Sequence, residues 1–203
     1  DVTLDEFKSQ ESGIIASIEK VDNSIAKEIA YGAIWAVILS LIAIALYVLI
    51  RFRDVAFSIG TLVALTFDAL FILSFYSLFS GMLPFSMEID QAFIAAILTV
   101  IGYSVNDKVV VFDRIRENLA DANKKTDLAE VVNRSITQTL SRSIYTSVTT
   151  FVMVAMLFVL GVSSIRAFAL PLMVGIVCGA YSSVCITGAL YYLMKTKIQK
   201  KEK

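Results

Sequence analysis

The sequence predicts an all-α protein, a polytopic membrane bundle of five transmembrane helices. Of its 203 residues, 57% are hydrophobic and 18% are charged, whereas soluble domains average about 45–50% apolar and about 25% charged residues. The mean hydropathy of +0.75 is too high for a water-soluble fold of this size. The apolar residues gather in five stretches, each close to the about 20 residues that a helix needs to cross a bilayer. Only two prolines and nine glycines interrupt them.

The first two predicted spans follow a polar N-terminal segment. The first covers about residues 31–50 and ends where Arg51 and Arg53 bring charge into the chain. The second covers about residues 55–79 and contains a single charged residue, Asp68.

The remaining three spans differ in how much charge they carry. The third begins near residue 91 and runs past residue 111, with Asp107 and Lys108 in its second half. The fourth covers about residues 144–162 and the fifth about 167–194, and both are free of acidic residues.

The fifth span also carries features that point to packing. Gly175-x-x-x-Gly179 is a small-residue pattern that lets helices approach closely. Pro171 is expected to begin or bend the helix. Cys178 and Cys185 share this apolar stretch, where thiols usually serve packing.

The distribution of basic residues predicts the orientation of the spans. Lys and Arg concentrate in residues 51–53, 113–142 and 195–203, which must lie on one side. The opposite connections, 80–90 and 161–166, hold one basic residue between them. The basic side is therefore the cytoplasm, with the N-terminus of the chain outside and its C-terminus inside.

This orientation divides the chain into three parts. Residues 1–28 are expected to be the tail of an external domain, residues 29–194 the transmembrane domain, and residues 195–203 a basic cytoplasmic tail. An external N-terminus before the first span suggests the C-terminal part of a longer protein with at least one earlier span. Within the transmembrane domain, residues 113–141 have the apolar spacing of an amphipathic helix at the cytoplasmic surface. The alternative is a solvated, charged loop.

The composition excludes several kinds of chemistry. The net charge is zero, so the chain has no basic field with which to bind nucleic acid. The absence of histidine excludes histidine catalysis, zinc sites with histidine ligands and imidazole proton relays. Proton transfer would therefore fall to Asp, Glu, Lys or Tyr.

Charged residues inside the spans are the candidate functional residues, because a charge at mid-membrane costs on the order of 3 kcal/mol. Asp68, Asp107 and Arg142 are such residues. Helical spacing places further polar residues on the faces of Asp107 and Arg142, and the predicted ion pathway comprises Asp107, Arg142, Tyr103, Asn106, Thr146, Thr149, Thr150 and Asp68.

The two polar stripes are expected to face each other across neighbouring antiparallel helices. Asp107 would then pair with Arg142 in a gated proton path. The carboxylate would take up a proton when unpaired and release it when the guanidinium approaches, and the hydroxyls would line a water wire. The alternative is an ion pair that only locks two helices together, with Asp68 capping or pairing locally.

Two segments carry a family resemblance. Residues 102–118, GYSVNDKVVVFDRIREN, resemble the signature of the SecF family of bacterial protein-export membrane proteins. Residues 138–150, QTLSRSIYTSVTT, are similar to the family's second signature, and the stretch around Asp68 is a weaker third match. The resemblance covers nearly the whole chain from about Val21 onward.

The resemblance implies the fold and the partners of a SecF protein, in the resistance-nodulation-division superfamily. Such a protein has six spans and a large external domain after the first, so this chain would be spans two to six. The implied partners are SecD (separate or fused upstream), the SecYEG channel, YajC, the exported preprotein and the bilayer of the bacterial inner membrane.

The resemblance also implies a mechanism. The proton-motive force would drive late translocation of secreted proteins, without enzyme activity or cofactor and with protons or sodium as the coupling ion. The family's essential aspartate and arginine fall on Asp107 and Arg142.

Two positions depart from the family pattern. Lys108 stands where the family usually has a small hydroxyl residue, and it is expected to extend to the cytoplasmic edge or to pair with Asp107. Phe67 precedes Asp68 where the family usually has histidine.

Two other functions stay open, namely proton-driven efflux of small molecules within the same superfamily and a membrane scaffold with a packing ion pair.

Overall fold

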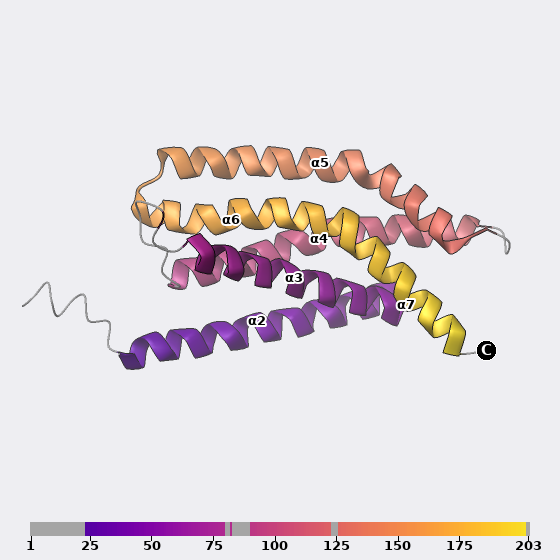
Figure 1. The fold of residues 1–203 in the computed structure, drawn as a ribbon, viewed down its shortest axis with the longest axis horizontal. Helices are drawn as coiled ribbons and strands as arrows, with labels where there is room; N and C mark the ends of the chain where they lie inside the picture. Colours follow the sequence, from indigo (N-terminus) through magenta and orange to yellow (C-terminus); the bar gives the residue numbers. More distant parts are fainter. Residues whose placement is uncertain (1–22, 80–81, 83–89, 123–125, 202–203) are drawn as a thin grey trace, which may run out of the picture. The chain divides into compact units, whose positions relative to one another are not determined.

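The computed structural model describes residues 23–79, 82, 90–122 and 126–201. The chain divides into two compact units, Asp1–Ala36 and Val37–Lys203. The elements, in chain order, are α2 (Asn23–Phe52), α3 (Val55–Phe79), α4 (Gln91–Asp121), α5 (Leu128–Leu160), α6 (Ser163–Tyr181), the π-helix η1 (Ser182–Ile186) and α7 (Thr187–Lys201). Figure 1 labels the six α-helices. Every element in these described ranges is helical, which confirms the predicted fold class.

The predicted number of spans is also confirmed. Within the described part of the chain, five helical segments are long and apolar enough to cross a membrane, and they are Tyr31–Phe52, Val55–Phe79, Gln91–Asp121, Leu128–Leu160 and Ile165–Lys197. The predicted external tail is described only from Asn23 onward, and most of the predicted loop at 80–90 lies outside the described residues.

The predicted amphipathic segment at 113–141 consists of two helix ends. Helix α4 continues to Asp121, and α5 begins at Leu128. The start of α5 is capped by Asp127, whose side chain accepts a hydrogen bond of 3.3 Å from the backbone N–H of Ala129. The helices therefore extend well beyond their apolar stretches.

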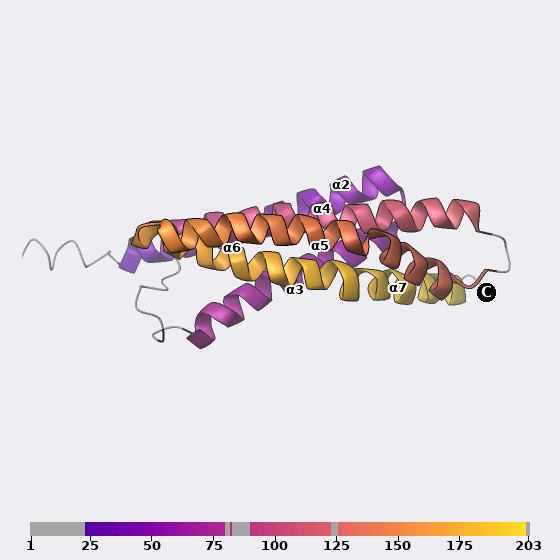
Figure 2. The same cartoon turned by 90° about the horizontal axis from the view of Figure 1, so that it is seen from above.

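Helix α4 is central in the larger unit. It contacts α3, α5, α6 and α7, and α6 lies beside both α4 and α5 (Figures 1 and 2). An aromatic cluster joins α3, α4 and α7, in which the Phe57 ring stacks on Tyr191 at 4.3 Å and lies 4.7 Å from Phe112. The side chains of α4 therefore have neighbours in several directions.

Pro171 lies inside α6, which begins at Ser163, so the proline does not begin this helix. Proline has no N–H, and the carbonyl four residues earlier consequently loses its helical partner. That carbonyl belongs to Ala167, and it accepts a hydrogen bond of 3.1 Å from the hydroxyl of Tyr76 on α3. Tyr76 thus satisfies the backbone group that Pro171 leaves free.

The two glycines of the small-residue pattern lie where α6 crosses α4. A Cβ at Gly175 would overlap both γ-methyl groups of Val100, and a Cβ at Gly179 would lie 2.8 Å from the Oγ of Ser104. Gly175 and Gly179 are four residues apart on α6, and the residues that they meet, Val100 and Ser104, are also four residues apart on α4. The pattern therefore has the packing role that the sequence predicts.

Replacing Gly175 by alanine is expected to lower the free energy of unfolding by about 1–3 kcal/mol, because an added methyl group overpacks a close helix contact. Combining Gly175→Ala with Val100→Ala should restore most of this loss. The matched control is Gly102→Ala, since a Cβ at Gly102 meets nothing within 4 Å. Denaturant unfolding of the full-length protein in detergent measures all three, and equal effects at Gly102 and Gly175 would contradict the interpretation.

The fifth predicted span is interrupted by one π-helical turn. Between α6 and α7, the backbone N–H of Thr187 donates to the carbonyl of Ser182, five residues earlier, and so does the Thr187 hydroxyl, at 3.0 Å. Single π-turns of this kind are rare and are frequent at functional sites. The turn shifts the register of the helix just where Ser182 faces the interior.

Candidate functional site

A buried ion pair joins Lys108 of α4 to Asp68 of α3. Both side chains are 0% exposed, and the Lys108 Nζ lies 2.8 Å from the Asp68 Oδ2. Both alternatives predicted for Lys108, extension to the cytoplasmic edge and pairing with Asp107, are therefore wrong. The physical reason is that consecutive residues on a helix do not face the same neighbour, so Lys108 points toward α3 while Asp107 faces α5.

Three further side chains complete this buried network. The Lys108 ammonium also donates to the Oγ of Ser104 and, at 2.9 Å, to the Oγ of Ser182. The Ser104 hydroxyl donates to the Asp68 Oδ2 at 2.6 Å, and the Cys178 thiol donates to the Asp68 Oδ1 at 3.6 Å. All three ammonium donors and both carboxylate oxygens are thus engaged.

The buried network depends on the local shape of α6 and η1. Gly179 leaves room for the Ser104 side chain, and the π-helical turn begins at Ser182. An unpaired charge in this position would be costly, whereas a fully hydrogen-bonded pair compensates for much of its desolvation. The arrangement ties α3, α4 and α6 together, and an ion could pass through Asp68 only if these bonds were broken.

Asp107 is the second buried carboxylate, and its surroundings differ. Its side chain is 5% exposed, and its Oδ2 accepts a long hydrogen bond of 3.5 Å from the Ser147 hydroxyl of α5. Among the described residues it forms no ion pair within 4 Å. Asp107 can therefore gain or lose a proton without the loss of an existing salt bridge.

The predicted pair of Asp107 and Arg142 is not formed in the described structure. Arg142 is exposed on α5, and Asp107 is buried between α4 and α5. The face of α5 that is buried against α4 carries a different set of residues, and Arg142 lies at the edge of this contact, in the lining of a pocket that also includes Asp113 and Glu117 of α4. The prediction of a direct ion pair is therefore wrong in this conformation, while the role of either residue in ion movement stays a prediction.

Of the other predicted pathway residues, two lie in the contact between α4 and α5, and three are exposed. The Tyr103 hydroxyl donates to the Oγ1 of Thr150 at 3.3 Å, which links α4 and α5. Asn106, Thr146 and Thr149 are exposed. The hydroxyls of Thr146, Thr149 and Thr150 each donate to carbonyls of their own helix.

The face of α5 toward α4 carries a hydroxyl stripe that the sequence interpretation missed. Four small hydroxyl residues recur at every fourth position, and none is more than 7% exposed. They are Ser135, Thr139, Ser143 and Ser147. Their spacing of four residues was a readable signal, because small residues at that spacing favour close helix contact.

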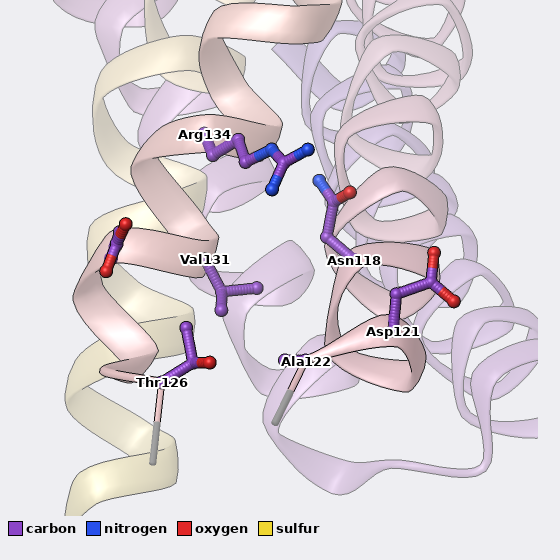
Figure 3. A pocket seen from close by; sticks show the side chains of 7 residues that line it. Asn118, Asp121, Ala122, Thr126, Val131 and Arg134 are labelled. Atoms are coloured by element: carbon purple, nitrogen blue, oxygen red, sulfur yellow. The ribbon is translucent and has the colours of Figure 1, made fainter. Parts of the chain in front are cut away.

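Two polar pockets lie along the seam between α4 and α5. One has a volume of about 310 Å³ and includes Asp113, Glu117, Thr139 and Arg142 in its lining. The other has a volume of about 230 Å³ and lies nearer the connection between the helices, where Arg134 extends from α5 toward Asn118 of α4 (Figure 3). Asn118 donates to Ser135 at 2.7 Å and to Gln138 at 2.9 Å, and these bonds cross the seam.

In a comparison with known families, residues 3–197 match the family described as "Protein export membrane protein SecD/SecF, C-terminal". The chain is 47% identical over 172 residues to a protein translocase subunit SecF of Rhodothermus marinus, covering 85% of this chain and 55% of that protein. It is 40% identical over 201 residues to a SecF of Petrotoga mobilis, covering 99% of this chain and 64% of that protein.

A relative of different length is the protein translocase subunit SecDF of Bacillus subtilis. It is 40% identical to this chain over 188 residues, which cover 92% of this chain and 25% of that protein. The chain therefore spans somewhat over half the length of the SecF relatives and about a quarter of the SecDF relative.

Proposed function

The chain belongs to the SecD/SecF family of protein-export membrane proteins, and we propose that the full protein is an auxiliary subunit of the Sec protein-export machinery. In this proposal it uses the proton-motive force to drive the late translocation of secreted proteins across the bacterial inner membrane. It acts as an ion-driven component rather than an enzyme.

The observation that carries the ion-driven part is the contrast between the two buried carboxylates. Asp68 is engaged in a salt bridge and further hydrogen bonds. Asp107 has a single long hydrogen bond, from Ser147, among the contacts of the described residues. A carrier must exchange its ion at low cost, which favours Asp107 and leaves Asp68 as an anchor.

The exposure of Arg142 supports a partner on this side of the bundle. Arg142 and Thr149 of α5 and Asn106 of α4 are exposed, although charged and polar groups facing lipid are costly. We infer that the SecD half covers this face and that Arg142 approaches Asp107 in another state of the cycle. SecYEG, YajC and the preprotein complete the proposed assembly.

The energy available from the gradient is sufficient for such a cycle. One elementary charge that crosses about 100 mV releases about 2.3 kcal/mol. That energy would bias a two-state motion of the external domain about fiftyfold at room temperature. Protons are the proposed coupling ion, and sodium is the alternative.

The scaffold alternative is weakened by the position of the packing ion pair. The bond that locks helices together is Asp68–Lys108, so Asp107 is not needed for that purpose. No feature of the described residues favours small-molecule efflux over protein export.

The proposal is tested by arresting a preprotein part-way through inner-membrane vesicles that contain the full-length protein and SecD. With ATP removed, an imposed proton gradient should complete translocation, and a protonophore should stop it. A sodium gradient of equal size identifies the coupling ion. Completion that is the same in vesicles lacking the protein would refute the proposal.

A further inference from the structure

The hydroxyl stripe of α5 connects the two features that matter for ion movement. At one end the Ser147 hydroxyl donates to Asp107. Further along the helix, Thr139 lines the pocket of about 310 Å³ that also includes Arg142. Ser143 lies between them, one helical turn from each.

Ser143 has an unusual environment. Its side chain is 2% exposed, and its Oγ has no hydrogen-bond partner in the described part of the protein. The neighbouring stripe hydroxyls are satisfied, since Ser135 donates to the carbonyl of Val131 at 2.7 Å and Thr139 to that of Ser135 at 3.1 Å. A buried hydroxyl without a partner is unfavourable, and each such group in a native protein calls for an explanation.

The pocket beyond Ser143 is suited to hold water. Its volume of about 310 Å³ is large beside the about 30 Å³ that one water occupies in the liquid. Asp113 and Glu117 from α4 and Arg142 from α5 supply charged groups to its lining. It lies on the side of the bundle that the basic residues predict to be cytoplasmic.

We propose that Ser143 and Ser147 position a proton relay of water between Asp107 and this pocket. A water hydrogen-bonded to Ser143 accepts the proton of the Asp107 carboxylic acid, so that one O–H bond breaks at Asp107 and one forms at the water. The carboxylate keeps the electron pair, and the excess proton leaves through water in the pocket.

This relay rests on the proposed function of Asp107 as ion carrier. It differs from the predicted ion pathway in the route that the proton takes. The proton runs along the buried face of α5, inside this chain. The hydroxyls of Thr146 and Thr149 would then not line the exit, because they are exposed and donate to carbonyls of their own helix.

The test is proton flux into proteoliposomes that contain the full-length protein with SecD, under an imposed membrane potential. Ser143→Ala is expected to lower the flux about tenfold, which corresponds to a barrier higher by about 1.4 kcal/mol. Its thermal midpoint should stay the same or rise, because the removed hydroxyl has no partner in the described protein. A purely structural role of Ser143 would not combine these two results.

Two further variants make the outcome decisive. Thr137→Val is the matched control, since the Thr137 hydroxyl is exposed on the same helix and donates to its own helix, to the Asn133 carbonyl at 2.9 Å. Normal flux in Ser143→Ala together with lost flux in Asp107→Asn would overturn the relay and leave the proposed function intact. Normal flux in Asp107→Asn would overturn both.

Discussion

Replacing Asp107 by asparagine is expected to lower the proton flux of the full-length protein by about a hundredfold or more, the scale on which positioned proton-transfer groups contribute. Asparagine has nearly the same shape, and its amide oxygen can still accept the hydrogen bond from Ser147. It cannot take up and release a proton. Insertion and thermal stability should therefore stay near those of the unchanged protein, while gradient-driven export is lost.

The matched control for this change is Asp121→Asn, which removes an exposed carboxylate at the end of the same helix. It should retain both flux and export. Flux is read in proteoliposomes with a pH-sensitive dye, and export in vesicles with an arrested preprotein. Full export by a stably inserted Asp107→Asn protein would show that the ion passes elsewhere, and Asp68 would be the next carboxylate to examine.

The fold was predictable because membrane spans are determined by composition and length. A stretch of about 20 apolar residues has few alternatives to a helix in a bilayer, so the five spans agree with the structure. The ends were less predictable. Hydropathy does not predict that α5 begins at Leu128 or that α6 begins before Pro171, because the first turns of both helices contain polar residues. The π-helical turn at Ser182 left no compositional signal.

The candidate site was predictable in its residues but not in its contacts. Helix α5 carries two polar stripes, one with Arg142 and one with Ser143. Periodicity identifies both stripes, whereas the rotation of the helix against its neighbour depends on packing volume. The stripe of small residues meets α4, and the stripe with the large arginine is exposed. Residue size was therefore a better guide than charge complementarity to which stripe of α5 packs against α4.

The same argument explains why the partner of Lys108 was missed. Sequence proximity suggested Asp107, but the nearest carboxylate in space is 40 positions away, on α3. Ser104 offered a local signal, because it precedes Lys108 by one helical turn and shares its face. A hydroxyl in that position indicates where the ammonium is directed.

Replacing one member of this buried pair is expected to have the largest effect on stability. Lys108→Met leaves the Asp68 carboxylate without its cation, and Asp68→Asn leaves the ammonium without its anion. Each should lower the free energy of unfolding by about 3–5 kcal/mol, the range for breaking a buried ion pair from one side. Denaturant unfolding of the full-length protein in detergent provides the measurement.

The double variant Asp68→Asn with Lys108→Met separates an ion pair from mere packing. It leaves no unpaired charge in the interior, so it should recover most of the loss that either single change causes. Arg51→Met is the control, because the Arg51–Asp113 pair is about half exposed and its loss should cost less than about 1 kcal/mol. If the two single losses simply add in the double variant, Lys108 and Asp68 act independently, and the anchor assigned to Asp68 would have to be abandoned.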